Sequence, residues 1–160
     1  MSKSFIAAET QLPEITIKVI LISVVLTLIL ATSNAYLALK VGMLTSASIP
    51  AAMLSMGILR WFKRSNILEN NLIQTAASAG EAVAGGIVYT VPALIMIHYW
   101  THFNYWQNMI LALIGGVLGV MFSIPLRHVL VHEPTLRFPE GKAIAQVLIA
   151  GTAKNFQLKP

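Results

Sequence analysis

Charged side chains are scarce in this chain, and aspartate and cysteine are missing altogether. Lys, Arg, Asp and Glu make up 11% of its 160 residues, against roughly 25% in a typical soluble domain. Without cysteine there is no disulfide framework and no thiolate metal site. Hydrophobic residues reach 56%. This composition excludes an ordinary soluble domain and indicates an integral membrane protein.

Four long apolar stretches predict an all-α membrane fold with about four transmembrane helices. They cover residues 15–39, 43–61, 72–97 and 105–126, and roughly 20 apolar residues cross the hydrocarbon core of a bilayer. Pro50 interrupts the second stretch, where we expect it to free a backbone carbonyl. The predicted organisation is a cytoplasmic lead (1–14), a four-span region (15–126), and a cytoplasmic loop, short amphipathic or re-entrant helix (139–150) and tail within 127–160.

Basic residues predict the orientation of these spans. Arg60, Lys63 and Arg64 separate the second and third stretches, and Arg127 and Arg137 follow the fourth. The loop 98–104 contains neither Lys nor Arg. The positive-inside rule therefore puts the N-terminus in the cytoplasm. We expect a multi-pass protein of the cell membrane, the inner (plasma) membrane if the source is bacterial.

Glu81 is the main candidate for chemistry, because it is the only charged residue between residues 72 and 126. An ionised and unpaired carboxylate inside a membrane costs several kcal/mol, so Glu81 should face a partner, a cavity or a proton. Gln74, Ser78, Glu81 and Gly85 share one helix face at this spacing. Polar Asn34 and Tyr36 interrupt the first stretch. Two readings stay open: a binding site for substrate or protons, or a neutral carboxyl hydrogen-bonded to Asn34 or a backbone carbonyl.

A run of amides, SNILENN at residues 65–71, precedes the third stretch. Asn66 and Glu69 have the spacing of a helix capping box. Capping leaves Asn70 and Asn71 unexplained, and neutral amides at a helix start also suit peptide-like or zwitterionic groups. All four residues are therefore candidates for substrate binding, with helix capping as the structural alternative.

The histidines give only a weak metal signal. His128 and His132 are four residues apart and could bind a metal if helical, but they follow Pro125 in a basic stretch that we expect to be a solvated loop. No nucleophile triad, phosphate loop or zinc-protease motif is present in the sequence. We expect no enzyme activity, no cofactor, no metal site and no nucleic-acid partner.

Six ordered blocks of the sequence resemble the oligopeptide transporter (OPT) family, nearest to its bacterial and yellow-stripe-like branches. They are NAYLALKVG (34–42), SASIPAA (46–52), SNILENN (65–71), TAASAGEA (75–82), IPLR (124–127) and FPEG (138–141). The resemblance implies proton-coupled import of small peptides, or of metal chelated by amino-acid-derived ligands. It also implies a partial fold, because members of this family are several times longer and have about sixteen spans.

The resemblance thus identifies the chain as an N-terminal part of such a transporter, which we do not expect to be active alone. Residues 152–160 depart from the family pattern. One alternative is a small membrane subunit that assembles with a partner chain supplying the remaining spans. Another is a four-span membrane protein of non-transport function.

Overall fold

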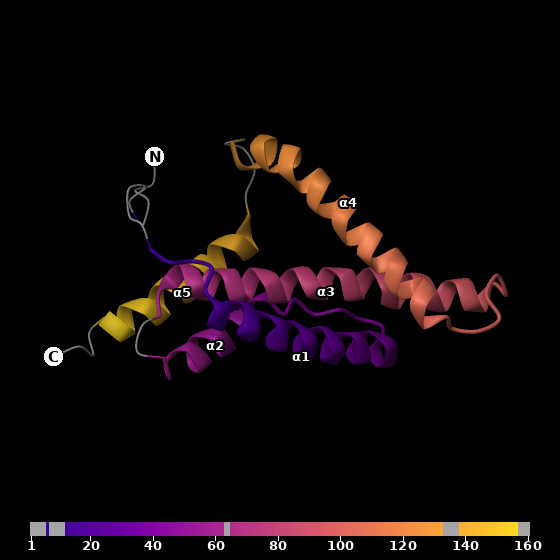
Figure 1. Cartoon of the computed structure of the whole chain (residues 1–160), viewed down its shortest axis with the longest axis horizontal. Coiled ribbons are helices and arrows are strands. Elements are labelled where there is room, and N and C mark those ends of the chain that lie inside the picture. The colour runs from indigo at the N-terminus through magenta and orange to yellow at the C-terminus, as the bar shows by residue number, and fades with distance from the viewer. Residues whose placement is uncertain (1–5, 7–11, 63–64, 133–137, 157–160) are drawn as a thin grey trace.

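The computed structural model describes residues 6, 12–62, 65–132 and 138–156, and this part of the chain is helical with no β-strand (Figure 1). The helices are α1 (Ile17–Val41), α2 (Ser48–Leu59), α3 (Ile67–Met96), α4 (Tyr105–His132) and α5 (Pro139–Phe156). The predicted all-α membrane fold is confirmed. Three of the helices, α1, α3 and α4, are long and apolar enough to cross a membrane. Most of the predicted lead and the last tail residues lie outside the described residues.

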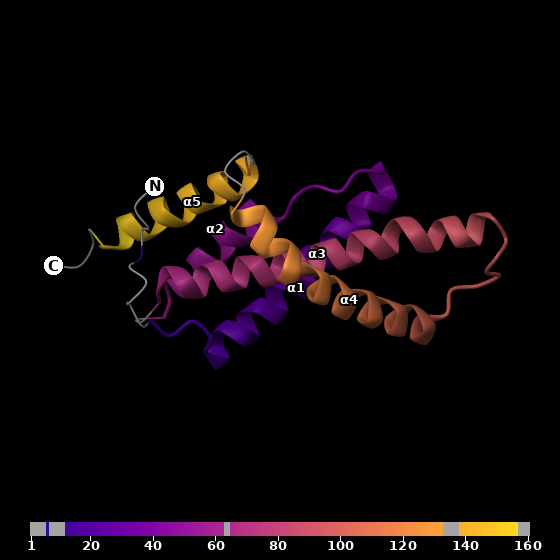
Figure 2. The ribbon, with the colours of Figure 1, turned by 90° about the horizontal axis from the view of Figure 1, so that it is seen from above.

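Helices α1 and α3 lie side by side and begin at the same end of the molecule (Figures 1 and 2). At that end the Thr16 hydroxyl donates a hydrogen bond to Glu69 Oε1 at 3.2 Å. A small core of Val19, Leu26, Leu59 and Ile73 joins α1, α2 and α3. Three consecutive helical elements are therefore held by one apolar cluster.

The second predicted span differs from a single helix. The left-handed residue Gly42 (φ 78°) ends α1, and residues 42–47, which we call the return segment, are not helical. The return segment runs back along α1 to the start of α2 (Figure 1). The four residues between left-handed Gly42 and helical-angled Ala47 cover at most about 14 Å, and the twelve residues of α2 add about 18 Å. Together they are long enough to cross a hydrocarbon core of about 30 Å.

Pro50 explains where this predicted span changes conformation. We expected it to interrupt a helix, but it lies in the first turn of α2. Pro50 is the third residue of α2, where the absence of its N–H is tolerated because first-turn N–H groups have no intrahelical acceptor. The proline ring would clash with the carbonyl of residue 46 if the helix extended backwards. Helix α2 therefore begins just before Pro50, and residues 43–47 are not helical.

Other boundaries also move. Helix α3 begins five residues before the predicted position 72, because Asn66 and Glu69 form the expected capping box at its start. Helix α4 continues through Pro125 to His132, and α5 extends six residues beyond the predicted position 150. The two histidines thus lie in the last turns of α4, and the expected loop at His128 is wrong. The described residues contain no group of three or more potential metal-ligating side chains.

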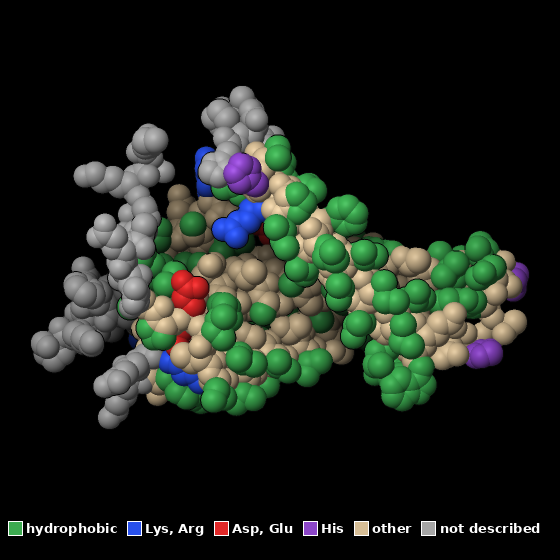
Figure 3. Space-filling model, turned by 45° about the horizontal axis from the view of Figure 1, so that its top comes forward, with side chains coloured by type: hydrophobic (Ala, Val, Ile, Leu, Met, Phe, Trp, Pro, Cys, Tyr) green, Lys and Arg blue, Asp and Glu red, His purple; other side chains and the backbone are tan. Residues whose placement is uncertain are grey.

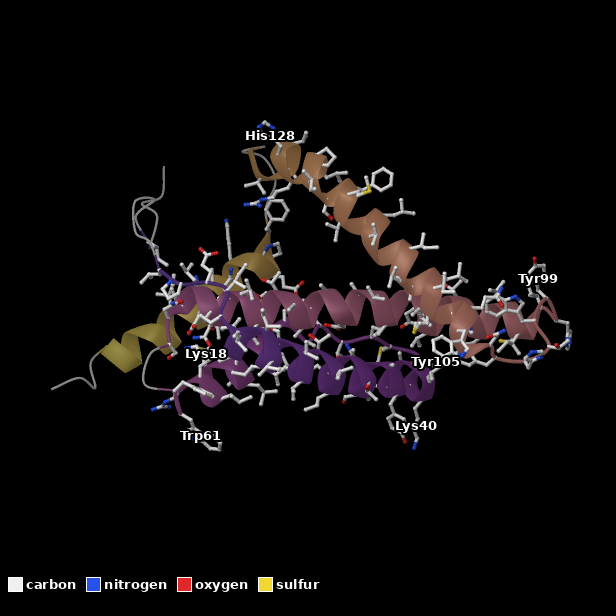
Figure 4. All side chains as sticks on the ribbon, in the orientation of Figure 1. Lys18, Lys40, Trp61, Tyr99, Tyr105 and His128 are labelled. Atoms are coloured by element: carbon white, nitrogen blue, oxygen red, sulfur yellow. The ribbon has the colours of Figure 1, made fainter. Side chains whose placement is uncertain are left out.

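The two ends of the molecule carry the residues expected at membrane boundaries. Trp61 and Lys18 lie towards the end where α1 and α3 begin, whereas Tyr99, Tyr105 and Lys40 lie towards the opposite end (Figure 4). On the face drawn in Figure 3, lysine, arginine and glutamate side chains gather near the first of these ends, and hydrophobic side chains extend over the rest. This separation suits a chain that spans the membrane along α3.

Helices α4 and α5 are attached differently. Helix α5 packs against α2 and α3, and Gly151 leaves room for the sulfur of Met56. Helix α4 touches α3 near the Tyr99 end and then leans away from it (Figure 1). None of the most apolar part of α4 is buried within the described structure.

Candidate polar site at the broken span

The amide of Asn34 holds the return segment against α1. Asn34 is 3% exposed, and its Nδ2 donates to the Thr45 carbonyl at 2.6 Å. Its Oδ1 accepts from the Thr45 backbone N–H at 3.3 Å and from the Thr45 hydroxyl at 3.1 Å. Non-helical backbone at membrane depth must be satisfied by protein, since lipid offers no hydrogen bonds. One buried side chain of α1 satisfies both backbone groups of Thr45.

Glu81 of α3 completes this attachment. Its Oε1 accepts a hydrogen bond from Asn34 Nδ2. Its Oε2 accepts from the backbone N–H of Ala47 at 2.7 Å. The Ala47 N–H lies immediately before α2, where N–H groups have no acceptor within the helix. The carboxylate therefore links α1, the end of the return segment and the start of α2.

A row of hydroxyl groups extends the polar region on both sides. Ser48 Oγ lies 2.7 Å from Ser78 Oγ, and Gln74 Nε2 donates to Ser78 Oγ at 3.2 Å. On the other side, Ser46 Oγ lies 3.2 Å from Ser48 Oγ and hydrogen-bonds with the Glu140 carboxylate of α5. We call the set Asn34, Thr45, Ser46, Ala47, Ser48, Gln74, Ser78, Glu81 and Glu140 the break site.

The break site lies far from either end of α3. Glu81 is the fifteenth of the thirty residues of α3, so it sits at the middle of the helix. Gly85, one turn further, is also buried and faces Leu44 of the return segment. The predicted inward face of Gln74, Ser78, Glu81 and Gly85 is therefore confirmed as a packing surface.

The amides at the start of α3 form a separate group. Glu69 is 1% exposed, and Lys18 Nζ lies 2.9 Å from its Oε2. Asn66 accepts from the Glu69 N–H at 2.9 Å and donates through Nδ2 to the Pro13 carbonyl at 2.8 Å. Twelve residues of helix separate Glu69 from Glu81, which is about 18 Å along the axis. Through these contacts Asn66 and Glu69 hold the first residues of α1, and the residues just before it, against the start of α3.

The remaining candidates lie apart. Asn70 is buried, and its Oδ1 has no hydrogen-bond partner within the described structure; Asn71 is exposed and its carbonyl accepts from Thr75. Tyr36 is 62% exposed and accepts from Lys40 Nζ at 3.2 Å. Within the described chain Tyr36 does not share the buried side of Asn34, because two residues along a helix turn the side chain through about 200°.

Comparison with known proteins assigns the chain to a family. The family model for the OPT oligopeptide transporter protein matches residues 14–157. This chain belongs to the OPT family. A candidate oligopeptide transporter of Haemophilus influenzae is 47% identical over 116 residues, which make up 72% of this chain and 18% of that relative. No solved structure matches the chain. The OPT chain described here thus spans less than a fifth of the length of its curated relative.

The family assignment and the three long apolar helices together identify this OPT chain as a multi-pass protein of the cell membrane. Its break site lies wholly within the residues matched by the family model. Sequence reasoning missed Thr45, Ser46, Ser48 and Glu140 as members of that site. Glu140 stood in a recognised block, but only the folding of α5 onto α2 brings it to Ser46 across 94 residues.

Proposed function

We propose that this chain is the N-terminal part of a proton-coupled OPT transporter, with Glu81 as the residue that carries the transferred proton. One observation supports this proposal above the others: the Glu81 carboxylate accepts a hydrogen bond from the backbone N–H of Ala47, at the point where the non-helical return segment meets α2. Secondary transporters commonly bind substrates and coupling ions at discontinuous helices near the bilayer midplane. The non-helical return segment before α2, with Glu81 bonded to it from the middle of α3, supports this proposal.

The hydrogen bonds of Glu81 offer a physical means of coupling. An ionised carboxylate accepts from both Asn34 Nδ2 and Ala47 N–H. A protonated carboxyl has become a donor at one oxygen. A proton on Oε2 would face the N–H of Ala47, and a proton on Oε1 would face the amide NH₂ of Asn34. A proton at Oε2 would weaken the attachment of the return segment, and a proton at Oε1 would weaken the contact between α1 and α3.

The substrate class follows from the family and the chemistry of the site. Oligopeptides, or metal chelates of amino-acid-derived ligands, carry amide, carboxylate and amino groups. The break site presents hydroxyls, amides and two carboxylates, which are groups that hydrogen-bond such molecules. The substrate would lie beside the return segment. The spans that complete its path would belong to a partner chain or to the remainder of a longer transporter.

The test is uptake into vesicles with a proton gradient. The chain alone should accumulate nothing from a mixed peptide pool, because alternating access needs a second structural half. Co-expression with the part of the Haemophilus relative outside the matched 116 residues should restore gradient-driven uptake. Glu81→Gln should then abolish the dependence on the gradient, while the exposed Glu14→Gln should not.

Two results would contradict the proposal. Accumulation by the chain alone would show that it forms a complete carrier. Unchanged rate and pH dependence in the Glu81→Gln assembly would leave Glu81 as a structural residue that holds the return segment.

A further inference from the structure

An open cleft of about 830 Å³ lies between α3 and α4. The two helices meet near the Tyr99 end and diverge towards the other end (Figure 1). A cylinder about 10 Å across, the width of a helix, fills this volume in about two helical turns. The cleft therefore has the size of a helical segment and not of a bulky domain.

Four glycines along the cleft have no explanation within the described chain. They are Gly86 of α3 and Gly115, Gly116 and Gly119 of α4, and a Cβ added at any of them would meet nothing within 4 Å. By contrast, the space beside Gly80, Gly85 and Gly151 is occupied by the side chains of Thr27, Leu44 and Met56, respectively. A helix-interior glycine costs about 1 kcal/mol relative to alanine. Small residues at this density allow a neighbouring helix to approach the backbone closely.

Three polar side chains that line the cleft donate hydrogen bonds to carbonyls of their own segment. Thr90 donates to the Gly86 carbonyl at 2.6 Å, Ser123 to the Gly119 carbonyl at 2.7 Å, and Asn108 to the Asn104 carbonyl at 2.7 Å. Their donors are therefore not directed at a polar ligand. The cleft suits an apolar occupant, in contrast to the break site on the opposite side of α3.

We propose that the α3–α4 cleft docks one apolar membrane-spanning helix from the part of an OPT transporter that lies outside the segment matched here. The inference rests on the proposed function as part of a larger carrier. The matched 116 residues are 18% of the Haemophilus relative, so most of that protein lies outside the match and can supply such a helix. Gly115 and Gly119 then form the surface on which the incoming helix packs.

Copurification tests this surface without measuring transport. The full chain is co-expressed with the remainder of the Haemophilus relative, one of the two carrying an affinity tag, and the ratio of the two is measured after extraction in mild detergent. Leucine at both Gly115 and Gly119 should lower the recovered partner at least tenfold. Gly57→Leu is the matched control, because Gly57 also has open space around it but lies on α2 outside the cleft. Its recovery should stay within twofold.

A second measurement separates docking from misfolding. The thermal unfolding midpoint of the double leucine variant should not fall below that of the parent chain, since a Cβ added at Gly115 or Gly119 meets nothing within 4 Å. The proposal is overturned if the unmodified chain does not copurify with the partner, or if Gly57→Leu loses it equally. It is also overturned if the double leucine variant retains the partner, or instead abolishes self-association of this chain. Intact copurification with no uptake would count against the proposed function alone.

Discussion

Replacing Asn34 by alanine should destabilise the protein more than any nearby polar substitution on α1. The change removes the partners of the Thr45 N–H and carbonyl and one hydrogen bond of Glu81. An unsatisfied buried polar group costs about 1–3 kcal/mol, so two orphaned backbone groups cost about 2–6 kcal/mol. That is a large part of the roughly 5–15 kcal/mol by which typical proteins are stable.

The measurement is the free energy of unfolding in bicelles, obtained by steric trapping. Ser33→Ala is the control, because Ser33 is the neighbouring polar residue on α1 and is exposed. Its effect should stay within about 0.5 kcal/mol, as for surface substitutions generally. In the Glu81→Gln background the cost of Asn34→Ala should change, because the two side chains share a hydrogen bond.

The reasoning would be refuted if Asn34→Ala and Ser33→Ala changed the unfolding free energy equally. The return segment would then be held by something other than the Asn34 amide, and the structural basis for coupling through Glu81 would be lost.

Three further predictions concern packing, charge and orientation. Gly80→Ala should destabilise by about 1–3 kcal/mol through overlap with Thr27, whereas Gly57→Ala should stabilise by up to about 1 kcal/mol; unfolding effects of the same sign would contradict this. Lys18→Met should cost about 1–3 kcal/mol because it leaves buried Glu69 with neutral partners only, and Lys40→Met, at an exposed lysine, should cost far less in the same assay. Reporter fusions after residues 64 and 102 should report cytoplasmic and external locations respectively, and a shared location would disprove the topology.

The polar stripe on the third span shows how far sequence periodicity reaches. Gln74, Ser78 and Glu81 fall on one helix face at 3.6 residues per turn, so their inward orientation followed from spacing alone. Tyr36 was grouped with Asn34 because both interrupt an apolar run, but the helix turns their side chains to different sides. Spacing predicts a face only where several positions repeat it.

The sequence by itself determined the helical membrane class, the capping box at Asn66, the inward face of α3 and the family, because these depend on local composition, spacing and ordered motifs. Only the tertiary structure decided that the second predicted span contains a non-helical segment followed by a short helix. Pro50 indicated that the helix is interrupted. Whether the backbone before it can remain non-helical depends on whether that backbone finds hydrogen-bond partners elsewhere in the fold. Those partners are Asn34 and Glu81, and Glu140 reaches Ser46 from 94 residues away. Such contacts depend on how helices pack, and no local pattern specifies them.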